Sequence, residues 1–197
     1  MCGRYTGYVE ESDELKTIYT AARAAYPDVD LREGEIYPTN TVPLLGVRGG
    51  RLLPFPASWG FPGNRGKAVI INARAETAAQ RPTFADSFRS RRCIVPTTGY
   101  FEWSAEKRKY LFRQPEKKIL YLAGLYAPCI DSTRFVVLTT AANESVASVH
   151  HRMPVVLEES ELAAWVCDMA EARRLMENKR PNLIFAEEQL QIGQSGN

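Results

Sequence analysis

The sequence predicts an α+β fold, with a mainly antiparallel, barrel-like β-sheet and a few flanking helices. Short extended runs rich in aliphatic and aromatic residues fill the middle of the chain, and Gly, Pro and Asn separate them. One amphipathic helical pattern precedes these runs, and two follow them. Many short strands beside a few helices are typical of α+β proteins.

The first helical pattern spans residues 11–26, and Ser12 is a suitable N-cap. Its apolar positions fall on one face, which we expect to be buried: Leu15, Ile18, Tyr19 and Ala22. The later helical patterns span about 158–166 and 169–178. The final residues, GQSGN, predict a frayed end.

The extended runs lie between residues 43 and 140. They read PLLGVR, RLLPF, AVIINAR, RCIVP, GYFEW, KYLFR, ILYLAGLY and RFVVLTT. The 197 residues, of which 45% are hydrophobic and 24% charged, are enough for one domain with a full core. We therefore expect a single domain over residues 1–190, with 191–197 as the frayed end.

Charge and cysteine spacing exclude several classes of protein. A net charge of +2 disfavours a wholly basic nucleic-acid binder, although a local basic groove stays possible. The four cysteines are far apart, without a C-x-x-C pair, which disfavours a zinc ribbon or a dense disulfide framework. No secretory leader follows Met1, and the longest uncharged stretch, ILYLAGLYAPCI, is too short to span a bilayer. We expect a cytoplasmic location without membrane contact.

Cys2 directly follows Met1 and allows two interpretations. It is either a small hydrophobic residue at the start of a strand, or, once Met1 is removed, a reagent with a free amine beside a thiol. Such a pair captures an aldehyde as a five-membered thiazolidine ring.

Strand alternation groups other polar residues. It predicts that Cys2 shares a face with Arg4, and Asn72 with Arg74. In GYFEW it predicts Phe101 and Trp103 in the core, with Tyr100 and Glu102 on the other side. Apolar neighbours would raise the pKa of Glu102 and suit it to acid–base work.

His150 and His151 are the only histidines. Consecutive residues rarely point the same way, so we expect one of them to act in catalysis. The spacing does not favour zinc. Arginines near these segments suit phosphate recognition: Arg4, Arg74, Arg81, Arg89, Arg91, Arg92 and Arg152. Trp59 and Phe61 are either surfaces on which bases can stack or ordinary core aromatics.

Taken in order, MCGRY, WGF, INARAET, CIVPTTGYFEW, LTTAAN and VHHRMPVVL resemble the SRAP (SOS response-associated peptidase) family. The matches run from Met1 to about Leu157. The resemblance implies a sensor of abasic sites in single-stranded DNA, which crosslinks to the ring-opened sugar through an N-terminal cysteine. It implies neither a metal nor an organic cofactor.

Carried over by motif, the resemblance implies that Cys2 is the nucleophile and that Asn72, Glu102 and His150 complete the catalytic set, with His151 at a variable position. It implies phosphate contacts for Arg4 and Arg74, and places Trp59 in the DNA cleft. The stretch YPTNTVP departs from the family's N-x-A-P, so Asn40 is given no role. No role is assigned beyond Leu157.

The expected function is therefore to shield abasic sites in single-stranded DNA through a reversible, lyase-like thiazolidine crosslink. It requires removal of Met1, either by self-cleavage or by an aminopeptidase. We expect a monomer, associated with the nucleoid when bound to DNA. One alternative is an N-terminal-nucleophile cysteine hydrolase or peptidase. The other is a non-catalytic module that binds single-stranded DNA.

Overall fold

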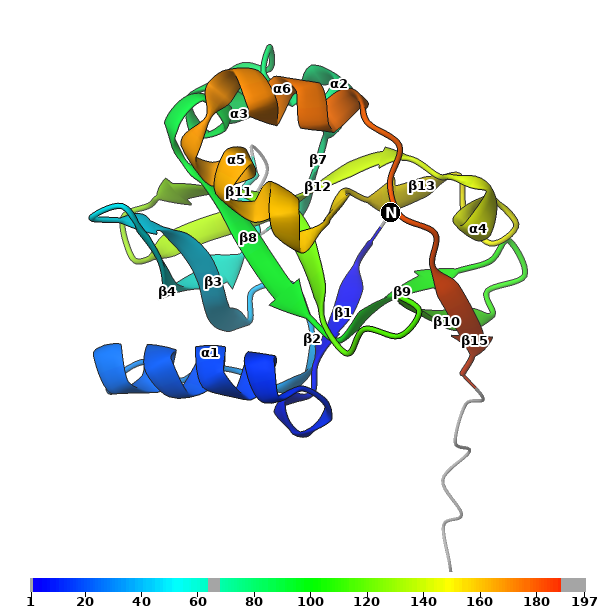
Figure 1. Cartoon of the computed structure of the whole chain (residues 1–197), viewed down its shortest axis with the longest axis horizontal. Coiled ribbons are helices and arrows are strands. Elements are labelled where there is room, and N and C mark those ends of the chain that lie inside the picture. Colours follow the sequence, from blue (N-terminus) through cyan, green and yellow to red (C-terminus); the bar gives the residue numbers. More distant parts are fainter. Residues whose placement is uncertain (1, 64–67, 189–197) are drawn as a thin grey trace, which may run out of the picture.

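The computed structural model describes residues 2–63 and 68–188. Its strands form two main sheets, with helices on two sides of them (Figure 1). In the described part of the chain, the pairings of β12 (Thr133–Ala141) with β4 (Arg51–Trp59) and with β7 (Asn72–Arg74) are parallel, and the other pairings are antiparallel. The predicted α+β class is confirmed.

The smaller main sheet has five strands and carries the beginning of the chain. Its strands follow in the order β15 (Ile184–Glu187), β10 (Lys109–Arg113), β9 (Gly99–Trp103), β1 (Arg4–Gly7) and β2 (Gly34–Ile36). β1 therefore lies between β2 and β9, and its backbone is fixed from both sides.

The larger sheet has eight strands, including β7 at the side of β12. Its main path runs through β13 (Arg152–Pro154), β12, β4, β3 (Thr41–Arg48), β8 (Arg92–Thr97), β11 (Leu120–Pro128) and β14 (Val156–Leu157). β11 also pairs with β12, which gives a ring-like but not closed sheet. β5 (Phe61–Pro62) and β6 (Val69–Ile70) form a separate two-stranded pair.

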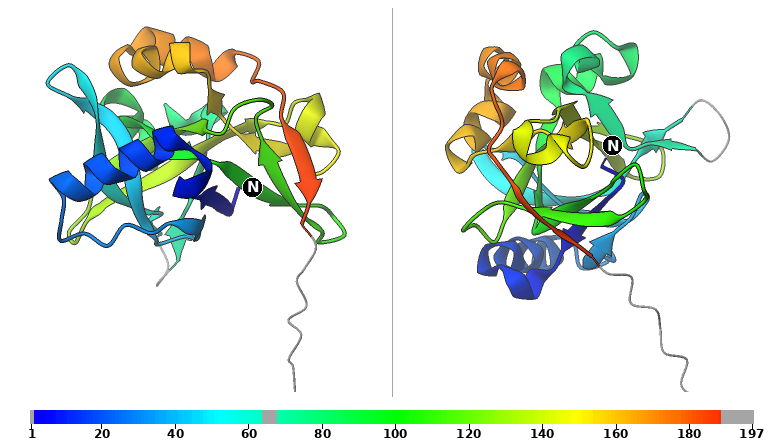
Figure 2. Two further views of the ribbon diagram at one scale, coloured as in Figure 1. Left: turned by 60° about the horizontal axis from the view of Figure 1, so that its bottom comes forward. Right: turned by 90° about the vertical axis from the view of Figure 1, so that its right-hand side faces the viewer.

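The helices lie on opposite sides of the sheets. α1 (Asp13–Ala25) covers one side, and α5 (Leu162–Cys167) and α6 (Met169–Glu177) lie on the other, as both views in Figure 2 show. The remaining helices in the described part of the chain are α2 (Ala75–Ala78), α3 (Pro82–Ser90), α4 (Glu144–Ala147), η1 (Val9–Glu11) and η2 (Glu159–Glu161).

The first predicted helix is confirmed. Its backbone begins after Ser12, whose hydroxyl accepts a hydrogen bond of 3.2 Å from the Leu15 N–H. Such a cap contributes about 1 kcal/mol by satisfying a donor that the first turn leaves unpaired. The four apolar positions predicted to face inward are all buried.

Continuous apolar strands separate two cores. In β8, Ile94 points into one core cluster, while Cys93 and Val95 point into the other. β12 repeats this alternation, with Val136 in the first cluster and Val137 in the second. A strand buried on both faces reads as an unbroken apolar run, which explains RCIVP and RFVVLTT.

The described residues contain no helix long and apolar enough to cross a membrane. The predicted frayed end at residues 191–197 lies outside the described residues, as does Met1.

Candidate functional site

Cys2 lies just before β1, and Asn72 holds its backbone. The Asn72 side-chain Nδ2 donates to the Cys2 carbonyl oxygen at 2.7 Å. Asn72 begins β7, which pairs with Val137 of β12 in the middle of the larger sheet. This hydrogen bond therefore connects the residue before β1 of the smaller sheet with β7 of the larger sheet, and it joins two residues that are 70 positions apart.

The Cys2 thiol is fully buried, with 0% exposure, and belongs to a core cluster. Burial raises the pKa of this thiol far above its usual range, and the charge of Glu102 raises it further. The thiol therefore carries its proton at neutral pH. Cys2 lies in the same core cluster as Tyr5, whereas Arg4 is only half-buried and pairs with Glu35, so the prediction that Cys2 shares a face with Arg4 is wrong.

Glu102 is 2% exposed in β9. Burial, the largest effect, raises the pKa of its carboxyl, while a hydrogen bond from the Trp103 backbone and the charge of His151 act in the opposite direction. A carboxyl whose pKa is raised by burial is suited to proton transfer.

The two faces of β9 are the reverse of the prediction. Tyr100, next to Glu102, packs in the core, where its ring stacks on Phe112 at 5.1 Å. Phe101 faces the other way and lies under the Lys109 ammonium, with Nζ 3.7 Å from the ring centroid. Both faces of the strand are covered, so hydrophobic alternation could not tell which face is the core.

His150 and His151 point the same way, contrary to the prediction. Their rings stack with centroids 4.4 Å apart. Nδ1 of His150 lies 3.0 Å from the Arg152 backbone nitrogen and 3.1 Å from the Arg152 carbonyl oxygen, so the backbone of Arg152 fixes the orientation of this ring. Burial lowers the pKa of His150, so the neutral form is favoured.

Arg4 lies on the outer face of the five-stranded sheet, next to the site. Its Nη1 contacts Glu35 Oε2 at 3.2 Å. Its guanidinium lies 4.1 Å from the Tyr37 ring centroid and 5.4 Å from that of Trp103. Arg4 is thus held in place by a carboxylate and by cation–π contacts.

The other arginines divide into exposed and structural groups. Arg74 is exposed at the end of β7. Arg152 makes a bidentate pair with Glu76, with distances of 2.6 and 2.9 Å. Arg92 is buried and donates to backbone carbonyls of α3 and α5, so it does not present its guanidinium to a phosphate.

Trp59 is fully buried, with 0% exposure. Its Nε1 donates to the Ile71 carbonyl at 2.9 Å, and its ring packs 5.0 Å from that of Tyr5. Phe61 is buried as well, against Phe84. Neither ring offers the free surface that base stacking needs, so this part of the prediction does not agree with the structure. Trp59 instead packs in the core against Tyr5 of β1.

Sequence reasoning missed Glu35 and Tyr37, which surround Arg4. Glu35 lies on β2, which has only three residues, and Tyr37 follows this strand as the first residue of YPTN. No periodic pattern marks either residue. Within residues 2–63 and 68–188, no group of three or more His, Cys, Asp or Glu side chains is placed to hold a metal ion.

With this arrangement established, comparison with known proteins places the chain in a family. The family model "SOS response associated peptidase (SRAP)" matches residues 1–191, and the chain belongs to this family.

Two curated relatives illustrate the similarity. The abasic site processing protein YoqW of Bacillus subtilis is 30% identical, over 84% of this chain and 80% of that protein. The abasic site processing protein YedK of Escherichia coli is 27% identical, over 84% of this chain and 79% of that protein.

Solved structures share the fold. A protein from Bacteroides thetaiotaomicron superposes with a TM-score of 0.76 at 21% identity, covering 96% of this chain and 93% of that one. A protein from Bordetella bronchiseptica gives a TM-score of 0.77 at 22% identity, covering 96% of this chain and all 100% of its own.

Proposed function

We propose that this chain processes abasic sites in single-stranded DNA by forming a covalent thiazolidine crosslink through Cys2. The observation that carries the proposal is the convergence of Asn72 and Glu102 on Cys2, through a 2.7 Å hydrogen bond and a charge effect on the thiol. Membership of the SRAP family and relatives named abasic site processing proteins support it.

The proposed reaction begins at nitrogen. The raised pKa of the Cys2 thiol keeps sulfur protonated, whereas an α-amine with a pKa of about 7.7–8.0 is partly neutral at pH 7. The amine attacks the sugar aldehyde, and loss of water gives an imine. The thiol then adds across the C=N bond: sulfur bonds to carbon, its proton passes to nitrogen, and the ring closes.

Glu102 and His150 move the protons in this scheme. Glu102, buried beside Cys2 with a raised pKa, serves the amine, the departing water and the thiol. His150, which burial keeps in its neutral form, assists opening of the sugar ring and dehydration. Asn72 fixes the Cys2 backbone and so orients the amine.

Arg4 and Arg74 bind phosphates on the strand that carries the lesion. Arg4 lies two residues after Cys2, about 7 Å along an extended chain, so it can reach a phosphate close to the reacting sugar. Binding through phosphates weakens as the salt concentration rises. The abasic nucleotide must leave a duplex for its sugar to reach Cys2, and this requirement favours single-stranded DNA.

The scheme requires removal of Met1, because with Met1 attached the nitrogen of Cys2 is an amide and forms no imine. Met1 lies outside the described residues. Removal by self-cleavage and removal by an aminopeptidase both satisfy the scheme.

A second candidate is an N-terminal-nucleophile peptidase, which the word peptidase in the family description favours. It needs a thiol that loses its proton readily, and the raised pKa of Cys2 weighs against it. A purely non-catalytic binding module is also less well supported, because Trp59 and Phe61 are buried.

The test is a denaturing gel of the Met1-free protein incubated with an abasic single-stranded oligonucleotide. We expect a species that survives denaturation with the abasic strand and none with an intact strand. Cys2→Ser, which keeps the amine, should give only an adduct that needs reduction to persist. Cys167→Ser, at an exposed free cysteine, should crosslink like the wild type. The absence of a stable species from Met1-free wild type would contradict the proposal.

A further inference from the structure

The Glu35 carboxylate forms an ion pair with Arg4, the cation that we propose for DNA binding. The Arg4 and Glu35 side chains, joined at 3.2 Å, are 28% and 24% exposed, so the pair is accessible from solvent. The negative charge of Glu35 therefore reduces the attraction between Arg4 and an approaching phosphate.

The position of Glu35 does not depend on Arg4. Its other oxygen accepts from Lys109 Nζ at 2.7 Å, and the Tyr37 hydroxyl donates to Oε2 at 2.9 Å. Burial raises the pKa of Glu35, but the hydrogen bonds from Lys109 and Tyr37 outweigh it and lower the pKa overall. Glu35 is thus ionised and stays in place when Arg4 turns to another anion.

Arg4 is likewise held without Glu35. The Tyr37 and Trp103 rings lie 4.1 and 5.4 Å from the guanidinium. Removing the carboxylate therefore leaves the cation in position with its charge unopposed.

We propose that Glu35 acts through Arg4 to weaken the binding of intact single-stranded DNA and to shorten the life of that complex. This inference rests on the proposed function. Phosphate contacts do not distinguish an intact strand from a damaged one. A protein that binds phosphates weakly leaves intact DNA quickly and is retained only where the lesion provides a covalent bond.

The experiment measures the affinity of the Met1-free protein for an intact single-stranded oligonucleotide over a range of salt concentrations. Glu35→Gln should bind about 3- to 10-fold more tightly at low salt, as expected for removing one charge from a partly exposed pair. The slope of log affinity against log salt should steepen by up to about 0.7, because the Arg4–phosphate contact then counts in full.

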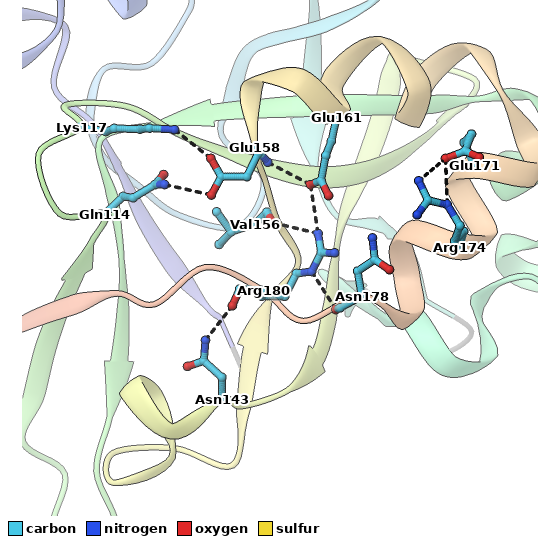
Figure 3. Close-up of polar contacts among 10 residues, drawn as sticks. All are labelled: Gln114, Lys117, Asn143, Val156, Glu158, Glu161, Glu171, Arg174, Asn178 and Arg180. Carbon is cyan, nitrogen blue, oxygen red and sulfur yellow. Dashed lines mark hydrogen bonds and ion pairs between the residues drawn. The ribbon is translucent and has the colours of Figure 1, made fainter.

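The matched control is Glu171→Gln, which removes the same charge from α6. Glu171 pairs with Arg174 at 2.6 Å (Figure 3), and α6 lies away from β1 and β2 (Figure 1). Its affinity and slope should stay close to wild type. Thermal unfolding shows whether each variant is folded.

A second variant tests the route through Arg4. In an Arg4→Met background, Glu35→Gln should have a much smaller effect, limited to the Lys109 ammonium that also pairs with Glu35. An undiminished effect there, or equal or weaker binding by Glu35→Gln alone, would overturn the inference while leaving the crosslink intact. Failure of the wild type to bind or crosslink single-stranded DNA would instead contradict the proposed function.

Discussion

Among single residues, Glu102 shows most clearly how burial prepares a side chain for chemistry. A carboxyl that is 2% exposed binds its proton more tightly in the folded chain than in the unfolded one. The raised pKa therefore costs stability as the pH rises above about 4.3, the ordinary value for glutamate, and that cost is the condition for its proposed role.

Glu102→Gln keeps the shape of the side chain and removes its charge. We expect a melting temperature equal to or above wild type at pH 7, and a difference that shrinks towards pH 4, where both side chains are neutral. Crosslinking should fall about 100-fold or more, because the amide cannot exchange a proton. Unfolding scans and gel-based rates measure the two effects.

The matched control is Glu106→Gln, at an exposed glutamate in the loop between β9 and β10. It should leave the melting temperature and the crosslinking rate unchanged. A Glu102→Gln variant that crosslinks at the wild-type rate would show that Glu102 has another role.

At the scale of elements, Arg92 at the start of β8 joins two helices to the sheet. Its Nη1 donates to the Phe88 carbonyl of α3 at 2.7 Å, and its Nε donates to the Trp165 carbonyl of α5 at 2.5 Å. A cation at helix C-termini satisfies carbonyls that the helices leave unpaired.

Arg92→Met should lower the free energy of unfolding by about 3 kcal/mol, since several buried carbonyls lose a charged donor. Arg89→Met is the control, because Arg89 pairs with Asp86 on the surface and such pairs contribute about 0–1 kcal/mol. Chemical denaturation measures both. Equal losses in the two variants would contradict the structural role of Arg92.

Over the whole molecule, the sequence predicted the helices and strands that have a clear local pattern of apolar residues. The helix at 11–26, its Ser12 cap and each of the eight extended runs are present. Several short elements were missed, because β2, β13, β14, β15, α2 and α4 have few residues and depend on tertiary contacts. The helix α3 was missed as well, since only Phe84 and Phe88 mark its apolar face.

In the candidate site, too, the sequence identifies some residues, whereas only the fold shows the contacts between them. Motifs named Cys2, Asn72, Glu102 and His150, but only the fold shows that Asn72 reaches the Cys2 carbonyl. The sequence could not decide whether Trp59 lines a cleft or packs in the core, because an aromatic side chain fits either place equally well, and the structure buries it. Glu35 gave no signal at all, since its importance depends on long-range pairing of β1 with β2.

The most direct test of the account is mass spectrometry of the protein before and after incubation with an abasic oligonucleotide. We expect a chain that lacks Met1 before reaction. Afterwards we expect a single adduct on the N-terminal peptide that begins with Cys2, with a mass increased by that of the abasic strand less one water. A stable adduct on any other residue, or on a chain that retains Met1, would contradict it.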